Sequence, residues 1–217
     1  IRTIHTNIAA KLPDYRSRPS QNYLVAEIAK TLAGDYHRTE RIAEIEAGTG
    51  TGKSLAYCIG AIPYAKQHKK SLIISTATVA LQEQLINKEL PFCAKNSGIE
   101  ISFELAKGRQ RYVCAERLYN ALVDDPSQLN FLATTDAPLN EKEQESLKQL
   151  QAAYKKGTWK GDRDTWPKVI SDNVWRLIQS DKHSCQRQLA SHAHCPFHSA
   201  RDRLAKADVI IVNHSLL

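Results

Sequence analysis

The amino-acid sequence predicts an α/β fold: a parallel sheet with helices on both faces. Four short runs, rich in β-branched residues or strictly alternating, are typical of strands and lie at 42–45, 71–75, 99–105 and 207–214. The stretches between the first three runs have the apolar spacing of helices. Strands that alternate with helices are typical of a parallel sheet. Ligands of such sheets bind at the carboxyl ends of the strands.

Helices are expected before and between these strand runs. Residues 1–33 have helical apolar spacing, interrupted at Pro13 because proline lacks the amide hydrogen that a helix interior needs. Another helix is expected to start directly after a glycine-rich segment at 46–54. A further helix is expected to follow the second strand run and to end before Pro91.

A long polar segment separates the last strand run from the others. It is rich in charged helical sequence, has almost no strand pattern and contains all three tryptophans, which we expect to hold it together. The simplest account is an insertion that leaves the sheet and returns to it. The predicted division is 1–105 for the first part of the α/β domain, 106–206 for the insertion and 207–217 for the return strand.

The glycine-rich segment has the context of a phosphate-binding loop: strand, glycine turn, Lys-Ser, helix. Glycines let backbone N–H groups point at a phosphate, and a helix N-terminus adds partial positive charge. Lys53 would reach the outer phosphates and Ser54 would ligate Mg²⁺. The pattern usually opens on glycine and here opens on alanine. The predicted nucleotide-binding residues are Ala47, Gly48, Thr49, Gly50, Thr51, Gly52, Lys53 and Ser54.

Composition narrows the class of protein. The formal net charge of +7 favours a polyanion partner, because nucleotide phosphates alone need few positive groups. No apolar run approaches 18 residues, and the first residues lack the apolar core of a signal peptide, so we expect no membrane span and a cytoplasmic location. An odd count of five cysteines argues against a secreted disulfide framework, and Cys58 and Cys93 are expected in the core.

Three further cysteines lie near the two ends of the predicted insertion: Cys114, Cys185 and Cys195. Thiolates placed there could join its entry to its exit through an iron–sulfur cluster or Zn²⁺. A zinc site is a real alternative, although no Cys-x-x-Cys pair is present. Its ligands would be Cys185, Cys195 and two of His192, His194 and His198.

Motifs along essentially the whole chain combine into one pattern. They lie at 18–21 (RPSQ), 46–54, 75–85 (STATVALQEQL), 107–114, 157–159 (GTW), 195–197 (CPF) and 212–217 (VNHSLL). Together they resemble the front portion of the DinG branch of the XPD-like iron–sulfur DNA helicases, in superfamily 2. The resemblance implies a P-loop, RecA-like domain that carries a mostly helical iron–sulfur insertion.

The resemblance also implies an activity. It would be an ATP-dependent DNA helicase of 5′→3′ polarity that acts in replication or repair, with ATP, Mg²⁺ and a [4Fe–4S] cluster as cofactors. Its partners would be single-stranded DNA and DNA junctions, and the protein would be a monomer. Cys114, Cys185 and Cys195 match three cluster ligands by position. The fourth cysteine has no match, and His192 is the candidate to replace it.

The resemblance assigns roles to further residues. Gln21 resembles an adenine-reading glutamine; the alternative is an ordinary residue at a helix start. Thr76 and Thr78 resemble a motif that contacts single-stranded DNA; the alternative is capping at the strand end. Three basic residues beside Cys114 would contact DNA phosphates or form a solvated turn. They are Lys107, Arg109 and Arg111.

Two features of these helicases have no counterpart in the sequence. The Asp-Glu-x-His segment that ligates Mg²⁺ is absent, as is a second motor domain with its arginine finger. We therefore expect an incomplete fragment that binds nucleotide weakly and does not unwind DNA by itself. The alternative function is a redox-sensing or nuclease-linked nucleic-acid-binding ATPase with zinc in place of the iron–sulfur cluster.

Overall fold

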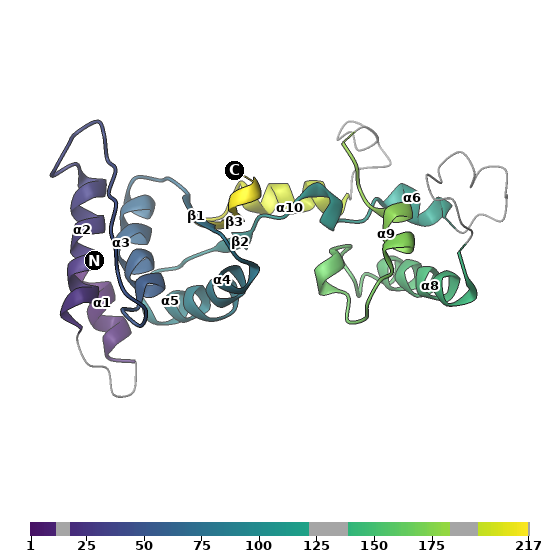
Figure 1. Cartoon of the computed structure of the whole chain (residues 1–217), viewed down its shortest axis with the longest axis horizontal. Coiled ribbons are helices and arrows are strands. Elements are labelled where there is room, and N and C mark those ends of the chain that lie inside the picture. The colour runs from purple at the N-terminus through teal and green to yellow at the C-terminus, as the bar shows by residue number, and fades with distance from the viewer. Residues whose placement is uncertain (12–17, 122–138, 183–194, 217) are drawn as a thin grey trace. The chain divides into compact units, whose positions relative to one another are not determined.

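The chain forms two compact units, shown in the computed structural model of Figure 1. The first unit contains residues 1–106 and 203–217, and the second contains residues 107–202. The first unit holds the sheet and the glycine-rich segment, whereas the second is mostly helical. The structure describes residues 1–11, 18–121, 139–182 and 195–216.

The sheet of the first unit has three parallel strands in the order β1-β3-β2. They are β1 (Leu72–Thr76), β2 (Phe103–Leu105) and β3 (Val209–Asn213). The last strand in the sequence is thus the central one, and it pairs with β1 from Leu72↔Val209 to Thr76↔Asn213. Its side chains at Val209 and Ile211 are fully buried, as expected for a central parallel strand. The predicted α/β fold with a parallel sheet and helices is confirmed.

Helices α2 and α3 pack side by side beside the sheet (Figure 1). Gly60 permits their close approach, because a β-carbon there would lie 3.0 Å from Cγ2 of Ile28 on α2. α2 ends at Gly34, whose φ of 84° is the left-handed cap conformation. The helical elements are α1 (Arg2–Ala9), α2 (Pro19–Ala33), α3 (Lys53–Gln67), α4 (Val79–Gln84), the π-helix η1 (Leu85–Glu89), α5 (Leu90–Asn96) and the 3₁₀ turn η5 (His214–Leu216).

The strand predicted at 42–45 is wrong. These residues form no strand, and the side chain of Ile42 is 85% exposed. An extended apolar run becomes a strand only where a neighbouring strand accepts its backbone hydrogen bonds, and none of the three described strands pairs with it. Pairing is also shorter than predicted near the third run, where only Phe103–Leu105 joins the sheet.

The helix predicted to end before Pro91 continues through it. α4 passes into the π-helix η1 and then into α5, which has Pro91 in its first turn. Proline removes one amide donor and crowds the preceding turn, and a π turn widens the helix at that place. The sequence alone signals the proline but not the local widening that accommodates it.

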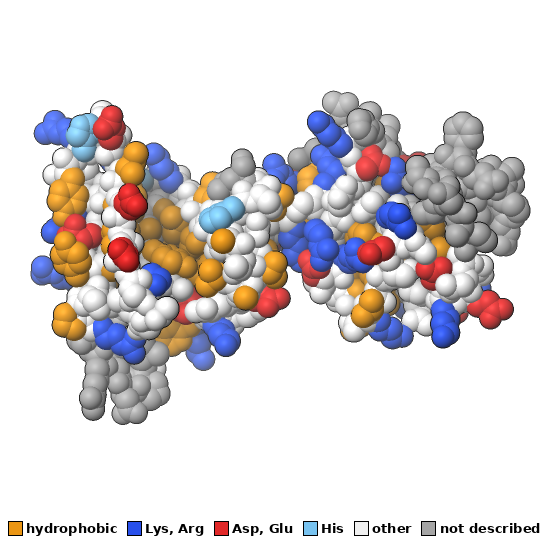
Figure 2. All heavy atoms as spheres, in the orientation of Figure 1, with side chains coloured by type: hydrophobic (Ala, Val, Ile, Leu, Met, Phe, Trp, Pro, Cys, Tyr) orange, Lys and Arg blue, Asp and Glu red, His pale blue; other side chains and the backbone are white. Residues whose placement is uncertain are grey.

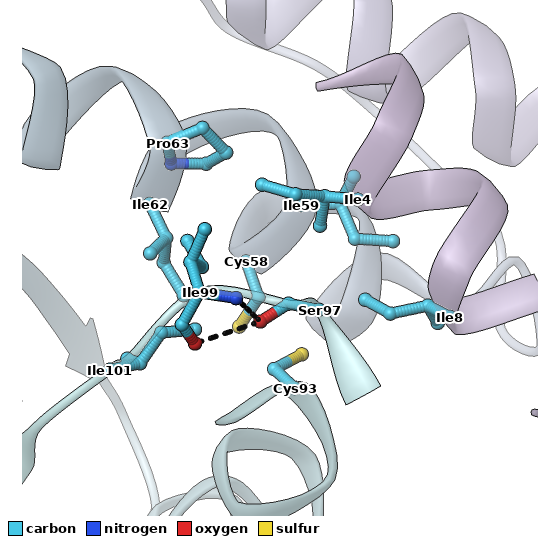
Figure 3. Close-up of a pocket in the computed structure, with 10 residues that line it drawn as sticks. All are labelled: Ile4, Ile8, Cys58, Ile59, Ile62, Pro63, Cys93, Ser97, Ile99 and Ile101. Atoms are coloured by element: carbon cyan, nitrogen blue, oxygen red, sulfur yellow. Dashed lines mark hydrogen bonds between the residues drawn. The ribbon is translucent and has the colours of Figure 1, made fainter. Parts of the chain in front are cut away.

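Part of the core of the first unit lies where α1, α3 and α5 pack against one another. Figure 3 shows the small cavity there, with Cys58 of α3 and Cys93 of α5 among its lining residues. Both thiols are buried, and they are hydrogen-bonded to each other. That bond, together with burial, raises the pKa of the Cys58 thiol. The prediction that these two cysteines belong to the core is confirmed.

The second unit packs its helices around tryptophan. The ring of Trp159 makes edge contacts with Trp166 (centroids 5.5 Å apart) and Trp175 (6.5 Å), and Leu147 and Val174 are fully buried beside them. The expectation that the tryptophans hold this part together is confirmed. Its elements are η2 (Arg109–Arg111), α6 (Ala115–Asn120), α8 (Glu141–Lys155), η3 (Arg163–Thr165), α9 (Asp172–Ile178) and most of α10 (Pro196–Leu204).

Acidic and basic side chains are interspersed over the face of the second unit drawn in Figure 2. No helix among the described residues is both long enough and apolar enough to cross a bilayer.

Candidate nucleotide site

The glycine-rich loop has the backbone shape that its sequence predicts. Gly50 and Gly52 have φ angles of 79° and 78°, a left-handed conformation that residues with a side chain rarely adopt. Gly52 is the N-cap of α3, so the loop leads directly into the free N–H groups of the helix start. The hydroxyl of Thr51 donates to the carbonyl oxygen of Gly48 and closes the turn.

Lys53 is the first residue of α3, and its ammonium group folds back over the loop. Nζ donates to the carbonyl oxygen of Ala47 (2.6 Å) and to that of Gly48 (3.0 Å). Phosphate oxygens are stronger acceptors than peptide carbonyls, so a phosphate group at this position would compete for the same ammonium. The hydroxyl of Ser54 hydrogen-bonds to Tyr57, one turn further along α3.

Two side chains from the start of α2 reach the loop. Gln21 is only 4% exposed, and its Nε2 donates to the carbonyl oxygen of Gly52 (3.1 Å). Arg18 Nη1 donates to the carbonyl oxygen of Gly50 (2.5 Å). The sequence predicts Gln21 as an adenine contact, whereas here it contacts Gly52, and Arg18 is not among the predicted site residues. A cation three residues before Gln21 was the available signal.

The carboxyl ends of β1 and β3 carry the predicted threonines and an unpredicted pair. Thr78 accepts from the backbone N–H of Leu81 as the N-cap of α4, and Thr76 Oγ1 donates to the carbonyl oxygen of Thr78 (3.2 Å). Thr78 thus makes a capping contact, as in the alternative interpretation, whereas Thr76 holds the carbonyl of Thr78. Beside them, Ser75 Oγ and His214 Nδ1 are 2.5 Å apart. A role for the threonines in DNA binding stays a prediction.

The three basic residues predicted to contact DNA have partners within the second unit. Lys107 is 16% exposed and pairs with Asp162 (2.5 Å) and Asp164 (3.1 Å). Arg111 also pairs with Asp164. The guanidinium of Arg109 lies over the ring of Phe197, 4.3 Å from its centroid. These charges were expected to face solvent, and two acidic residues that sequence reasoning did not consider neutralise two of them.

Two of the predicted cluster ligands can be placed. Cys114 and Cys195 are each 4% exposed and interact with each other electrostatically. Burial raises the pKa of the Cys114 thiol, while the backbone N–H and the charge of Arg117 oppose that rise. Cys195 also raises the pKa of the nearby Tyr154 hydroxyl, which reaches about 12 mainly through burial.

Cys185 and His192 lie outside the described residues, as does the alternative zinc ligand His194. Among the residues that the structure does describe, no group of three or more potential ligands is gathered. Two buried thiols, 81 positions apart in the sequence, nevertheless lie in the same unit, and one affects the pKa of the other. Soft thiolates suit iron–sulfur or zinc chemistry. The chemistry of these two residues is therefore compatible with a thiolate site.

Known proteins provide an independent comparison. The family model for the DEAD/DEAH box helicases matches residues 19–152. The chain is 50% identical over all 217 residues to the ATP-dependent DNA helicase DinG of Photobacterium profundum. It is 38% identical over 211 residues to the protein of that name from Escherichia coli K12, and 37% identical to the one from Salmonella choleraesuis.

These matches cover the chain almost completely but only part of each relative. The chain spans 31% of the Photobacterium protein and 29% of the Escherichia coli protein. The family match includes α2, the glycine-rich loop and the β1–α4 segment, and the three relatives share one name. The chain therefore belongs to the DEAD/DEAH box helicase family, and its predicted resemblance to the DinG-type helicases is confirmed.

Proposed function

We propose that the chain forms the nucleotide-binding part of an ATP-dependent DNA helicase. The observation that carries the proposal is the loop that leads into α3, with two left-handed glycines and with Lys53 Nζ held over it. This arrangement has the donors that a nucleotide phosphate chain requires. DNA as the substrate and helicase activity are inferred from the names of the relatives. Action in the cytoplasm and in replication or repair, with 5′→3′ polarity, belongs to the same proposal.

The residues would divide the work by position. Backbone N–H groups of the loop and of the first turn of α3 would hold the inner phosphates. Lys53 would transfer its hydrogen bonds from the carbonyls of Ala47 and Gly48 to the outer phosphates. The Ser54 hydroxyl would give up its hydrogen bond to Tyr57 and ligate Mg²⁺. Gln21 would contact the adenine while it supports Gly52. Further residues of the loop are Thr49, Gly50 and Thr51.

A [4Fe–4S] cluster is proposed for the second unit. Cys114 and Cys195 would hold it together with Cys185, and His192 would take the fourth position. When bound, the cluster would supply a covalent link between distant parts of the unit and a charge that changes with oxidation state. The burial of both thiols, and the electrostatic effect of Cys195 on the pKa of Cys114, support this proposal.

The cluster proposal is tested by metal content and colour. We expect the purified protein to be brown and to contain iron, and we expect Cys114→Ser and Cys195→Ser to lower the iron content. Cys93→Ser is the matched control, because Cys93 is an equally buried thiol in the other unit. A colourless protein that contains zinc would contradict the iron–sulfur assignment.

Single-stranded DNA is the proposed partner of the sheet edge and of the second unit, and the protein would act as a monomer at DNA junctions. Thr76 and Thr78 lie at the carboxyl end of β1, where ligands of parallel sheets bind. The basic residues Lys107, Arg109 and Arg111 would contribute only if their present partners were exchanged for phosphates. The net charge of +7 supports a polyanion partner.

Nucleotide binding by the 217-residue chain tests the proposed function. We expect a fluorescent ATP analogue to bind in the presence of Mg²⁺ and Lys53→Ala to weaken it at least about tenfold, because the lysine makes charge-assisted bonds. Lys88→Ala is the control, since Lys88 lies on the surface of η1. Equal affinities for the wild type and Lys53→Ala would overturn the assignment of the loop.

A further inference from the structure

Two carbonyl groups of the loop accept hydrogen bonds from side chains at the start of α2, but only one of them also accepts a hydrogen bond within α3. The carbonyl of Gly52 accepts from Gln21 and also from the backbone N–H of Ala56, which is the first hydrogen bond of α3. Its direction is therefore fixed by the helix even without Gln21. The carbonyl of Gly50 lies before the helix. Among the described residues, its hydrogen-bond donor is the Arg18 guanidinium.

The direction of the Gly50 carbonyl determines where the next amide points. A trans peptide unit is planar, so its C=O and N–H groups point in opposite directions. The guanidinium of Arg18 draws the Gly50 carbonyl towards the start of α2. The N–H of Thr51 must then point away from Arg18. Gly50 has no β-carbon, so its own side of this peptide unit is weakly restricted. The Thr51 hydroxyl anchors the other side through Gly48, and the Arg18 guanidinium adds a direct hold on the carbonyl itself.

We propose that Arg18 is a positioning residue for the nucleotide site, which it serves by orienting the Thr51 amide rather than by touching the nucleotide. This inference rests on the proposed function of the loop. By holding Gly50, Arg18 presents the Thr51 N–H as a ready donor to the inner phosphates, and the nucleotide does not have to reorganise the loop. Arg18 is exposed and belongs to no ion pair among those found in the described residues, so its contact with Gly50 is its specific tie to the fold.

An indirect role and a direct contact with the third phosphate make different predictions for the binding of ADP and of ATP. Loop amides hold the phosphates that both nucleotides share, whereas a guanidinium that touched the third phosphate would favour ATP alone. We therefore expect Arg18→Ala to weaken the binding of Mg-ADP and of a non-hydrolysable Mg-ATP analogue by the same factor. For a charge-assisted bond at an exposed site, that factor is about three- to tenfold.

The experiment measures both dissociation constants by titration of the 217-residue chain. Arg18→Gln is the second variant: it keeps a polar side chain, but its amide is too short to replace the guanidinium, and we expect the same parallel loss. Arg38→Ala is the matched control, an exposed arginine of the same unit. Its side chain makes no hydrogen bond or ion pair with the described residues, so both affinities should stay unchanged.

Unchanged affinities in both Arg18 variants would overturn the proposal, and so would a loss confined to the ATP analogue, which would make Arg18 a direct phosphate contact. A failure of the proposed function is recognised separately. In that case Lys53→Ala would also bind both nucleotides as well as the wild type does. Loss in Lys53→Ala without loss in the Arg18 variants would refute the role of Arg18 alone.

Discussion

At the scale of single residues, the candidate nucleotide site depends on backbone conformation more than on side-chain chemistry. Two glycines take the left-handed conformation, and the side chain of Gln21 occupies the space beside Gly52 where a β-carbon would lie. Lys53 makes its hydrogen bonds to loop carbonyls. The loop is thus already folded around donor groups, which reduces the reorganisation that binding would require.

Gly52→Ala tests this description of the loop. The new β-carbon would lie 2.2 Å from Gln21 Nε2, and the left-handed φ would cost about 1–2 kcal/mol by itself. We expect a lower free energy of unfolding for the first unit in a denaturant titration, together with weaker nucleotide binding.

Gly48→Ala is its control, because a β-carbon at Gly48 meets nothing within 4 Å and its φ is not left-handed. The description of the loop would be wrong if the two alanine variants had equal stability.

At the scale of elements, one carboxylate ties the sheet of the first unit to a helix. Asp208, just before β3, accepts from the N–H of Ser102 (2.8 Å) and from the hydroxyl of the same residue (2.9 Å). Lys66, near the end of α3, also donates to it (3.0 Å). Burial works against the charged carboxylate, but these donors together lower the pKa of Asp208 below its usual value.

Asp208→Asn should therefore destabilise the first unit in a pH-dependent way. A folded-state pKa below the unfolded value means that the stabilisation is present above the ordinary pKa of 3.8 and is lost as the pH falls through the folded-state value. We expect the variant to lose about 1–2 kcal/mol at pH 7, with the gap to the wild type closing in acid. Denaturant titrations at pH 7 and near pH 3 measure both quantities.

Asp35→Asn is the comparison variant, since Asp35 is exposed and its carboxylate makes no hydrogen bond or ion pair within the part of the chain that the structure describes. A gap for Asp208→Asn that stayed the same at both pH values would show that the charge of Asp208 does not matter.

The stability of the second unit can be measured separately by tryptophan fluorescence, because all three tryptophans of the chain lie in that unit. Their fluorescence therefore follows its unfolding alone. Leu147→Ala removes a fully buried side chain from α8 and should cost about 2–5 kcal/mol. Val169→Ala, at a side chain that is 96% exposed, should stay within about 0.5 kcal/mol of the wild type. Similar losses in both variants would contradict the core assignment.

At the scale of the whole molecule, local patterns were predicted well and distant contacts were not. The parallel sheet, the loop before α3 and the tryptophan core follow from periodicity and from motif spacing. The strand at 42–45 failed because strand formation depends on a partner that its own sequence does not specify. The division of the chain at 106–206 and the roles of the site residues stay predictions.

The same limit applies to charged residues. A run that contains Lys107, Arg109 and Arg111 predicts a basic surface, but Asp162 and Asp164, more than 50 positions away, pair with two of the three. Likewise, the contact between Arg18 and Gly50 spans 32 positions and leaves no local pattern. Such contacts are set by how elements pack, which one sequence does not encode in its periodicity.

The central claim is that residues 47–54 hold the phosphates of a nucleotide, and hydrogen–deuterium exchange tests it most directly. Peptides from this segment of the 217-residue chain would be followed with and without Mg-ATP, in the wild type and in Lys53→Ala. We predict slower amide exchange in 47–54 when Mg-ATP is added to the wild type, and little change in the variant. Unchanged exchange in this segment at a nucleotide concentration that protects another part of the chain would contradict the claim.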